Sequence, residues 1–543
     1  MNWSLRFSGL LILLACGCAG ATAPSGSPLG GEQNPVYGGT LTLQVSTDPI
    51  NFDPDDQGRT TPGNQGLAMA YNSLLGFQSG PGVDYSEMVL VPELAERWEV
   101  SPDARVVTFH LRRGVKFVNV APVNGRELTA ADVKFTMEFY TRTGEFKDRR
   151  GAESRNQFMY EGLAGVKVLD SHSVQVQFKE PFVPFISYAA SDWNPMLPRE
   201  IYDEDRHFKD RMAGTGTFRV DLQASQTGSR WVWKKNPNYW EEGKPYLDEV
   251  RWLVIPDDGT ARAAFQTKQV DVLGSQFFHD VQELAKANSA ARTYKYLQPH
   301  PNFLRLSQAR GSPFTDIKLR RAVALAIDRD EISRTVAGGE ALWAVSGAMP
   351  GLLSDAEIRE LAKQDLNEAK RLVAEAGYPD GLTVSFPTDP TRSQSDFTLF
   401  QLIQAQLKKA GITMDIKLVD RNVQRQMRRA GDYGIDGGTG LAPLEADNDS
   451  ILFGEFHSSV AGSTNYSYIK DPELDRLLEG QRREPNPEQR RELMRSAVRR
   501  IADQVWMIGL IYPPRWDVVQ SHVHNYQLHF GSKAPYLFAW VQK

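Results

Sequence analysis

The pattern of apolar and polar residues predicts strands in the first third of the chain. Apolar and polar side chains alternate in residues 40–45 (TLTLQV), 106–111 (VVTFHL) and 173–178 (SVQVQF), which predicts strands with one buried face. Between the last two, Thr129 followed by Asp132 resembles a capping box at the start of a helix. These features predict a lobe that is rich in β-structure and holds at least one helix.

Beyond residue 300 the apolar positions follow helical and strand periods in turn. Strands separated by helices of this length are typical of a parallel α/β sheet. Such sheets bind ligands at the carboxyl ends of their strands, and clefts between lobes are a common place for small-molecule sites. The pattern therefore favours a multi-lobed binding protein without naming its ligand. Helices are predicted at residues 365–376, 397–410, 471–481 and 487–505, and strands at 382–386, 413–419 and 506–512.

The first 36 residues differ from the rest of the chain. One cation in residues 1–6 and an apolar run at residues 7–15 (FSGLLILLA) predict a secretory signal. The two cysteines of the chain, Cys16 and Cys18, end this run (LLACGCAG), which resembles the bacterial lipobox, in which a cysteine is acylated. Residues 17–36 are rich in Gly, Ser, Ala and Pro, as in a flexible tether. We expect an extracytoplasmic protein, lipid-anchored to the bacterial membrane through Cys16 or, alternatively, Cys18.

Composition and motifs exclude several classes of function. Of 543 residues 24% are charged and the net charge is -5, so a cationic footprint for nucleic acid is absent. Asp53 begins a stretch like a calcium loop, but Asn64 stands where the bidentate glutamate is needed. His522 and His524 lie on one strand face without a cysteine or neighbouring carboxylate. No metal or cofactor is expected, and no hydrolase motif occurs, so a secreted hydrolase is the least favoured alternative.

Six segments along the body of the chain form an ordered set of motifs. They are residues 93–117 (ELAERWEVSPDARVVTFHLRRGVKF), 124–140 (NGRELTAADVKFTMEFY), 214–220 (GTGTFRV), 234–250 (KKNPNYWEEGKPYLDEV), 255–272 (IPDDGTARAAFQTKQVDV) and 313–332 (PFTDIKLRRAVALAIDRDEI). In sequence and order these segments resemble the family 5 extracellular solute-binding proteins, the peptide and nickel binders of ABC importers. The resemblance implies an α/β fold: a two-lobed, type II periplasmic-binding-protein clamp of the larger class with an additional β-rich domain.

The resemblance also implies a division of the chain and a function. The chain would capture a small solute, an oligopeptide or related compound, between its lobes and deliver it to ABC permease subunits in the membrane. We expect a monomer. A surface sensor or chaperone that binds without transport is the alternative. The implied parts are a signal peptide at residues 1–16, a tether at 17–36, lobe I at 37–80 with 195–298 and 508–543, an inserted β-rich domain at 81–194, and lobe II at 299–507.

The resemblance is incomplete at residues 438–449 (GTGLAPLEADND). Peptide-binding members carry Gly-Trp here, followed by an aspartate that pairs with the amino terminus of the ligand. This chain lacks the tryptophan, and Pro443 or Leu444 falls near the aspartate position. A buried ammonium without its carboxylate costs several kcal/mol. Either another acid substitutes, or the ligand has no such amine.

Two sets of residues are candidates for ligand contact. The first is Gly440 with the acids Glu445, Asp447 and Asp449, which we expect to face a cationic ligand, although a polar turn is the alternative. The second is the pair Asn51 and Phe52, in the loop after the first predicted strand, where a simple strand-terminating turn is the alternative.

Other residues of the resembling segments have structural interpretations. Arg320 and Arg329, with neighbouring acids, are interpreted as a solvated helix face. Trp231 and Trp233 are expected to pack in a core. Gly216 is expected to serve backbone geometry.

Overall fold

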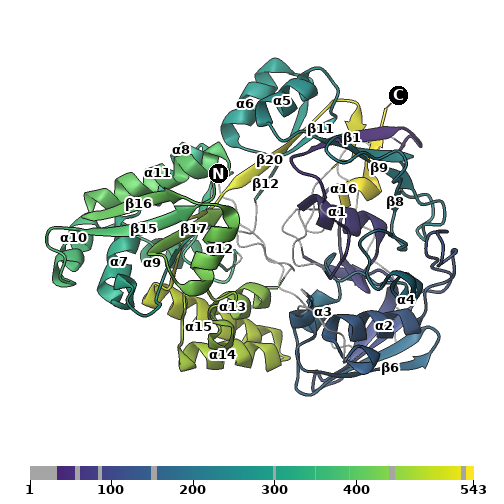
Figure 1. The fold of residues 1–543 in the computed structure, drawn as a ribbon, viewed down its shortest axis with the longest axis horizontal. Helices are drawn as coiled ribbons and strands as arrows, with labels where there is room; N and C mark the ends of the chain where they lie inside the picture. The colour runs from purple at the N-terminus through teal and green to yellow at the C-terminus, as the bar shows by residue number, and fades with distance from the viewer. Residues whose placement is uncertain are drawn as a thin grey trace. The chain divides into compact units, whose positions relative to one another are not determined.

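The computed structural model describes residues 34–49, 51–55, 61–83, 88–147, 154, 156–297, 301–348, 350–390, 392–439, 447–526 and 534–542. The chain divides into two compact units, coloured by residue number in Figure 1. The first unit comprises Ser8–Tyr296 and Trp516–Lys543, and the second contains Leu297–Arg515. The predicted lobe II, residues 299–507, falls within the second unit, whereas the division of the first unit into a lobe and an inserted domain stays a prediction.

A seven-stranded sheet organises the first unit. Its strand order is β12-β20-β11-β1-β10-β9-β8, with β1 parallel to β10 and β11, and β9 antiparallel to β8 and β10. The strand predicted at residues 40–45 is β1, and its apolar residues are the buried ones. The bounds are β1 Thr40–Val45, β8 Phe218–Val220, β9 Arg230–Lys235, β10 Glu249–Val254, β11 Val272–Gln276, β12 Arg292–Leu297 and β20 Pro514–Val519.

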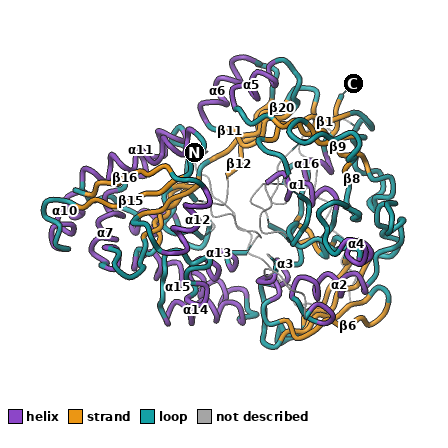
Figure 2. Tube along the Cα trace, in the orientation of Figure 1, coloured by secondary structure: helices purple, strands orange, loops and turns teal. Residues whose placement is uncertain are grey.

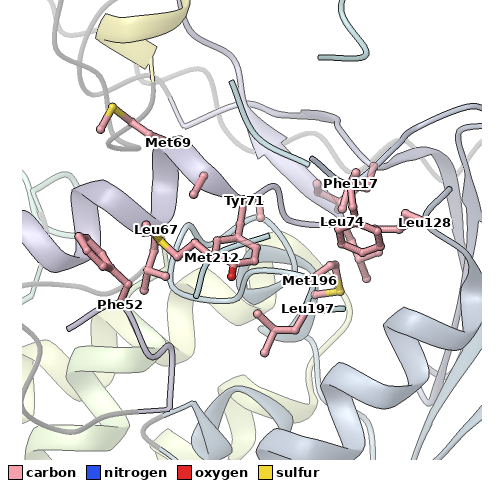
Figure 3. Close-up of a cluster of buried hydrophobic side chains, with 14 of the residues drawn as sticks. Phe52, Leu67, Met69, Tyr71, Leu74, Phe117, Leu128, Met196, Leu197 and Met212 are labelled. Atoms are coloured by element: carbon pink, nitrogen blue, oxygen red, sulfur yellow. The ribbon is translucent and has the colours of Figure 1, made fainter. Parts of the chain in front are cut away.

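One face of this sheet carries the largest core of the first unit. Trp233 and Trp252 are fully buried there, with ring centroids 4.9 Å apart, and Trp231 is 9% exposed. Figure 3 shows part of this core, where helix α1 (Thr61–Ala70) lies beside Phe52 and Tyr71. The expected packing role of the two tryptophans, Trp231 and Trp233, is confirmed.

The opposite face of the sheet is partly covered by two helices. Helices α5 (Asp258–Gln266) and α6 (Phe278–Ala287) bury Phe265 and Leu284 against Leu273 of β11. This smaller core covers the part of the face over β11 and β20, because Leu273 and Val518 point into it from those strands.

A second, four-stranded antiparallel sheet in the first unit has the order β4-β5-β7-β6. The strands β5 and β7 have the bounds predicted from alternation. Helix α2 follows Thr129, whose backbone N–H donates to the Asp132 carboxylate at 2.9 Å in the predicted capping box; Figure 2 shows α2 next to β6. The remaining bounds are β2 Leu75–Phe77, β3 Leu90–Pro92, β4 Ala95–Val100, β5 Val106–Leu111, β6 Leu163–Asp170, β7 Ser173–Phe178, β21 Val523–His524, β22 Trp540–Val541, α2 Ala130–Thr141, α3 Phe185–Tyr188, α4 Arg199–Asp205 and α16 Ala534–Phe538.

The second unit contains the predicted alternation of helices and strands. β15 and β16 are parallel, as predicted, whereas β17-β13-β18 form an antiparallel sheet. The strand predicted at residues 506–512 is two strands, because β18 pairs with β13 and β19 pairs with β14. The bounds are β13 Asn302–Leu306, β14 Leu342–Trp343, β15 Leu382–Thr388, β16 Ile412–Leu418, β17 Ile435–Thr439, β18 Met507–Gly509, β19 Ile511–Tyr512, α7 Ile317–Ala326, α8 Arg329–Ala337, α9 Asp355–Leu361, α10 Leu366–Glu375, α11 Gln394–Lys409, α12 Arg421–Ala430, α13 Asp449–Phe456, α14 Pro472–Arg483 and α15 Pro487–Gln504.

Two arginines that were predicted on a solvated helix face are buried instead. Arg320 and Arg329 are 5% and 2% exposed. Nε of Arg320 donates to the carbonyl oxygen of Gln504, the last residue of α15, and Arg329 donates to three backbone carbonyls, including that of Gly509. Carbonyls at a helix end have no partner within the helix. The interpretation as a solvated face was wrong because the charge pattern does not reveal which carbonyls need a donor.

In the part of the chain that the structure describes, we find no helix whose length and apolarity would suffice to span a bilayer.

Candidate functional site

The second unit brings the ends of two strands together. β15 and β17 lie side by side, since the backbone N–H of Gly434 donates to the carbonyl oxygen of Ser385 at 3.2 Å. Arg392 follows the end of β15 by four residues. Its Nη2 lies 3.4 Å from the carbonyl oxygen of Gly437 in β17. A cationic side chain therefore stands where the two strands end, which is the usual position of ligands in open α/β sheets.

The Arg392 guanidinium is largely buried without a full set of acceptors. The side chain is 19% exposed, and Nη1 lies 3.8 Å from Oδ2 of Asp396. The long bond to Gly437 is its sole hydrogen bond among the described residues, and the buried Nε has no acceptor there. Burial lowers the pKa of Arg392 below its usual value. Because a guanidinium carries five N–H donors, an anion placed here would complete its hydrogen bonding.

Gly438 keeps space beside this guanidinium. A Cβ at this position would lie 3.2 Å from the ring of Phe303 and 3.9 Å from Nη2 of Arg392. A larger side chain would press on the Phe303 ring and extend toward the guanidinium. Glycine at the end of β17 thus leaves the donors of Arg392 approachable.

A buried ion-pair network holds β17 in place behind Arg392. Arg305 of β13 and Asp436 of β17 are direct cross-strand partners with an Nη1–Oδ2 distance of 3.2 Å. Arg305 also contacts Glu455 at 2.6 Å, and Arg428 contacts Asp436 at 2.7 Å. Burial raises the pKa of Glu455, although the neighbouring Arg305 opposes this. Because each charge is paired inside the unit, the network serves to position the strand.

The predicted ligand acids Asp447 and Asp449 form ion pairs with arginines of two helices, α15 and α14. Asp447 is 6% exposed and receives two N–H groups of Arg490, each at 2.8 Å. Asp449 is fully buried and receives Nε and Nη2 of Arg482 at 2.7 and 2.9 Å. Arg482 also lies over the ring of Phe453, 3.3 Å from its centroid. Both acids therefore have a structural role in these ion pairs, and their expected contact with a cationic ligand stays a prediction.

Of the other predicted ligand residues, the structure describes Asn51 and Phe52. Asn51 and Phe52 lie in the first unit, where the Asn51 side chain accepts the N–H of Asp53 at 2.9 Å in a tight turn. Phe52 is 5% exposed and packs edge-on against Trp231 and Trp233, with centroid distances of 5.5 Å. The turn at Asn51 agrees with the alternative of a strand-terminating turn, and the packing of Phe52 in the core was not predicted. Gly440, Glu445, Cys16 and Cys18 lie outside the described residues.

Within the described ranges, no three His, Cys, Asp or Glu side chains gather as a metal ion would require. His522 lies 3.0 Å from the Asp271 carboxylate, so the prediction that it has no neighbouring carboxylate was wrong, because Asp271 is 251 residues away along the chain. His524 is stacked on Trp540 with a centroid distance of 4.0 Å. The two histidines thus contact different partners, a carboxylate and an aromatic ring.

Neither Arg392 nor the network around Arg305 was among the functional residues predicted from the sequence. Arg392 had a usable signal, because it is a cation that closely follows the strand predicted at residues 382–386. Arg305 had none, since its partners Asp436 and Glu455 are 131 and 150 residues away along the chain.

Comparison with known proteins places the chain among binding proteins. Residues 89–458 match the model of the bacterial extracellular solute-binding proteins, family 5. Heme-binding protein A of Haemophilus influenzae is 26% identical, with 97% of this chain and 96% of the relative covered. The dipeptide-binding protein of Escherichia coli is also 26% identical, with 97% of both covered.

Solved structures agree in fold. The periplasmic binding protein DppA of Helicobacter pylori, in complex with the peptide STSA, matches with a TM-score of 0.81 at 24% identity, over 94% of this chain and 99% of that protein. This likeness confirms the predicted α/β fold of the type II periplasmic-binding-protein class.

Proposed function

Because the chain belongs to the bacterial extracellular solute-binding proteins of family 5, we propose that it is the capturing component of an ABC importer. It binds a small solute outside the cytoplasm and passes it to permease subunits, held at the membrane by lipid on Cys16 or Cys18. Proteins of this family bind solutes rather than transform them, so the chain is a binding protein and not an enzyme.

The proposed solute carries an anionic group, such as the carboxylate of a peptide or related compound. The observation that carries this proposal is Arg392, a largely buried cation at the strand ends with one long hydrogen bond among the described residues. A buried guanidinium whose donors are only partly paired, here by the Gly437 carbonyl and more distantly by Asp396, is costly, and a carboxylate matches its fork of donors. An anionic solute therefore gains more from this surface than a neutral one.

The internal ion pairs of Asp447 and Asp449 support the same choice. A cationic group would have to compete with Arg490 and Arg482 for these carboxylates, each of which is held by two hydrogen bonds. The named ligands of two similar proteins, dipeptides and the peptide STSA, also fit, because a peptide has a terminal carboxylate.

Two measurements test the proposal. Native mass spectrometry of the protein purified from its own host should reveal a co-purifying compound with a carboxylate or another anionic group, whereas a neutral sugar would contradict the anionic class. Calorimetry with di- to tetrapeptides should then show binding of free acids and at least about tenfold weaker binding of the C-terminal amides, from the loss of a charge-assisted hydrogen bond.

A pair of matched variants tests whether Arg392 is the residue that binds the carboxylate of the peptide. Arg392→Gln should weaken binding of the free acids by about tenfold or more and leave the amides almost unchanged. Arg421→Gln is the control, because Arg421 of α12 is exposed and has no ion pair among the described residues. Equal binding of free acids by the wild type and Arg392→Gln would sink the assignment of Arg392.

A further inference from the structure

The seven-stranded sheet of the first unit has a polar surface on the face opposite its tryptophan core. Over β11 and β20 this face is covered by α5 and α6. Over β9 and β10 it opens into a hollow of about 380 Å³, which falls within the size range of small-molecule sites. We call it the β9–β10 hollow; its lining residues are Ala224, Arg230, Val232, Lys234, Glu249 and Arg251.

The register of the strands gathers cations on this face. Lys234 of β9 lies directly opposite Glu249 of β10 and directly opposite Arg219 of β8. Glu249 is 6% exposed, and its carboxylate contacts both Lys234, at 2.5 Å, and Arg251. A single buried carboxylate thus serves two cations on neighbouring positions of the sheet.

Two further cations have no such partner. Arg219 and Arg230 are exposed, and neither forms an ion pair with any residue that the structure describes. Nε of Arg230 donates to the carbonyl oxygen of Ala224 at 3.0 Å, which holds the side chain at the hollow. With Lys234 and Arg251, this face of β8, β9 and β10 carries four cations and one carboxylate, so three positive charges are unbalanced within the cluster. Arg219 does not line the hollow itself but lies directly opposite Lys234, which does.

Folding alone does not account for this excess. Like charges directly opposite on a sheet, as in Arg219 and Lys234, are destabilising, and the single carboxylate of the cluster, Glu249, pairs with Lys234 and Arg251 but not with Arg219. A local arrangement that costs stability without a structural gain is expected at a functional site. Guanidinium and ammonium groups at one hollow match the several oxygens and the negative charge of a phosphate group.

We propose that the β9–β10 hollow binds a phosphate group, which either a phospholipid headgroup or a soluble phosphate ester can supply. The hollow lies in the first unit, and the residues that support solute binding lie in the second, so this proposal does not depend on the proposed function.

The test uses a variant that spares the buried carboxylate. Arg219→Gln/Arg230→Gln removes the two unpaired cations and leaves both partners of Glu249 in place, so we expect it to fold. Arg421→Gln/Arg425→Gln, on α12 of the second unit, removes two exposed guanidinium groups elsewhere and is the matched control. Thermal unfolding of all three proteins checks that they are folded.

Each protein is tested for binding of inorganic phosphate by calorimetry and for flotation with vesicles of phosphatidylcholine alone or with about one third phosphatidylglycerol. Phosphate binding that falls at least about tenfold in the hollow variant but not in the control supports the proposal. If anionic vesicles are also bound, with the same dependence on Arg219 and Arg230 and with loss at high salt, the source is a headgroup. If vesicles are not bound, the source is a soluble ester. No phosphate or vesicle binding, or an equal loss in both variants, overturns it.

Discussion

Asp447 and Arg490 form a two-fold hydrogen-bonded ion pair, with both N–O distances at 2.8 Å and both side chains under 10% exposed. Arg490 lies in α15, and Asp447 lies two residues before the start of α13. Together with the pair of Asp449 and Arg482, this contact fastens the start of α13 to α14 and α15. The carboxylates that looked suited to a ligand thus hold three helices together.

Removing one partner of this pair should destabilise the protein strongly. Arg490→Met leaves the Asp447 carboxylate buried without its cation, which costs about 3–5 kcal/mol. Urea denaturation followed by circular dichroism measures the loss. Arg483→Met is the control, because Arg483 is 56% exposed and contacts Glu479 at 3.8 Å, so its loss should cost less than about 1 kcal/mol. Similar costs for both variants would contradict a structural role for the pair.

Stability should depend on the ionisation of Glu357. This carboxylate bonds the backbone N–H of Ser354 at the start of α9 and contacts Arg495 and Arg499 of α15. The bond to the Ser354 N–H, followed by that to Arg499, lowers the pKa of Glu357 to about 2. The folded state therefore binds this proton more weakly than the unfolded state. The contribution of Glu357 is present above pH 4.5 and is lost as the pH falls toward 2.

The variant Glu357→Gln tests this dependence. It should lower the free energy of unfolding by about 1 kcal/mol at pH 7, because Gln can still accept the Ser354 N–H but loses the charge that pairs with Arg495 and Arg499. The difference from the wild type should shrink toward pH 2. Glu360→Gln is the control, since Glu360 is 74% exposed and contacts Lys363 alone among the described residues. A difference that stays constant from pH 7 to pH 2 would exclude the carboxylate charge as its cause.

Gly216 should not tolerate a side chain. A Cβ there would lie 2.3 Å from the carbonyl oxygen of Met69 and 2.6 Å from the backbone nitrogen of Tyr71. Because backbone atoms cannot move aside cheaply, Gly216→Ala should cost about 3 kcal/mol or more in urea denaturation. Gly165→Ala is the control, since a Cβ at Gly165 meets no atom within 4 Å. An unchanged midpoint for Gly216→Ala would refute the close backbone approach.

Lipid attachment should require Cys16. Cells that express the full chain and take up an alkyne-labelled fatty acid should label the wild type and Cys18→Ser, but not Cys16→Ser, because Leu13, Leu14 and Ala15 precede Cys16 as in a lipobox. The converse pattern would move the anchor to Cys18. Labelling of the double variant would rule out both cysteines.

Local patterns determined many of the elements. The strands at residues 40–45, 106–111 and 173–178 were predicted with their observed bounds, because alternation of apolar and polar side chains is read directly from neighbouring residues. The capping box of Thr129 and Asp132 was equally local. Motifs spread along the chain identified the family, and the match of residues 89–458 confirms it.

The roles of the charged residues were decided by tertiary structure. Arg490 reaches Asp447 across 43 residues of sequence, and Arg392 reaches Gly437 across 45. Whether a charge is solvated, paired or left with unused donors depends on such distant partners, because the cost of burying it is set by the acceptors that folding brings to it. The sequence alone thus determined that this protein has the fold of a solute-binding protein, while the tertiary contacts decided which of its charges are paired inside the protein and which keep unused donors.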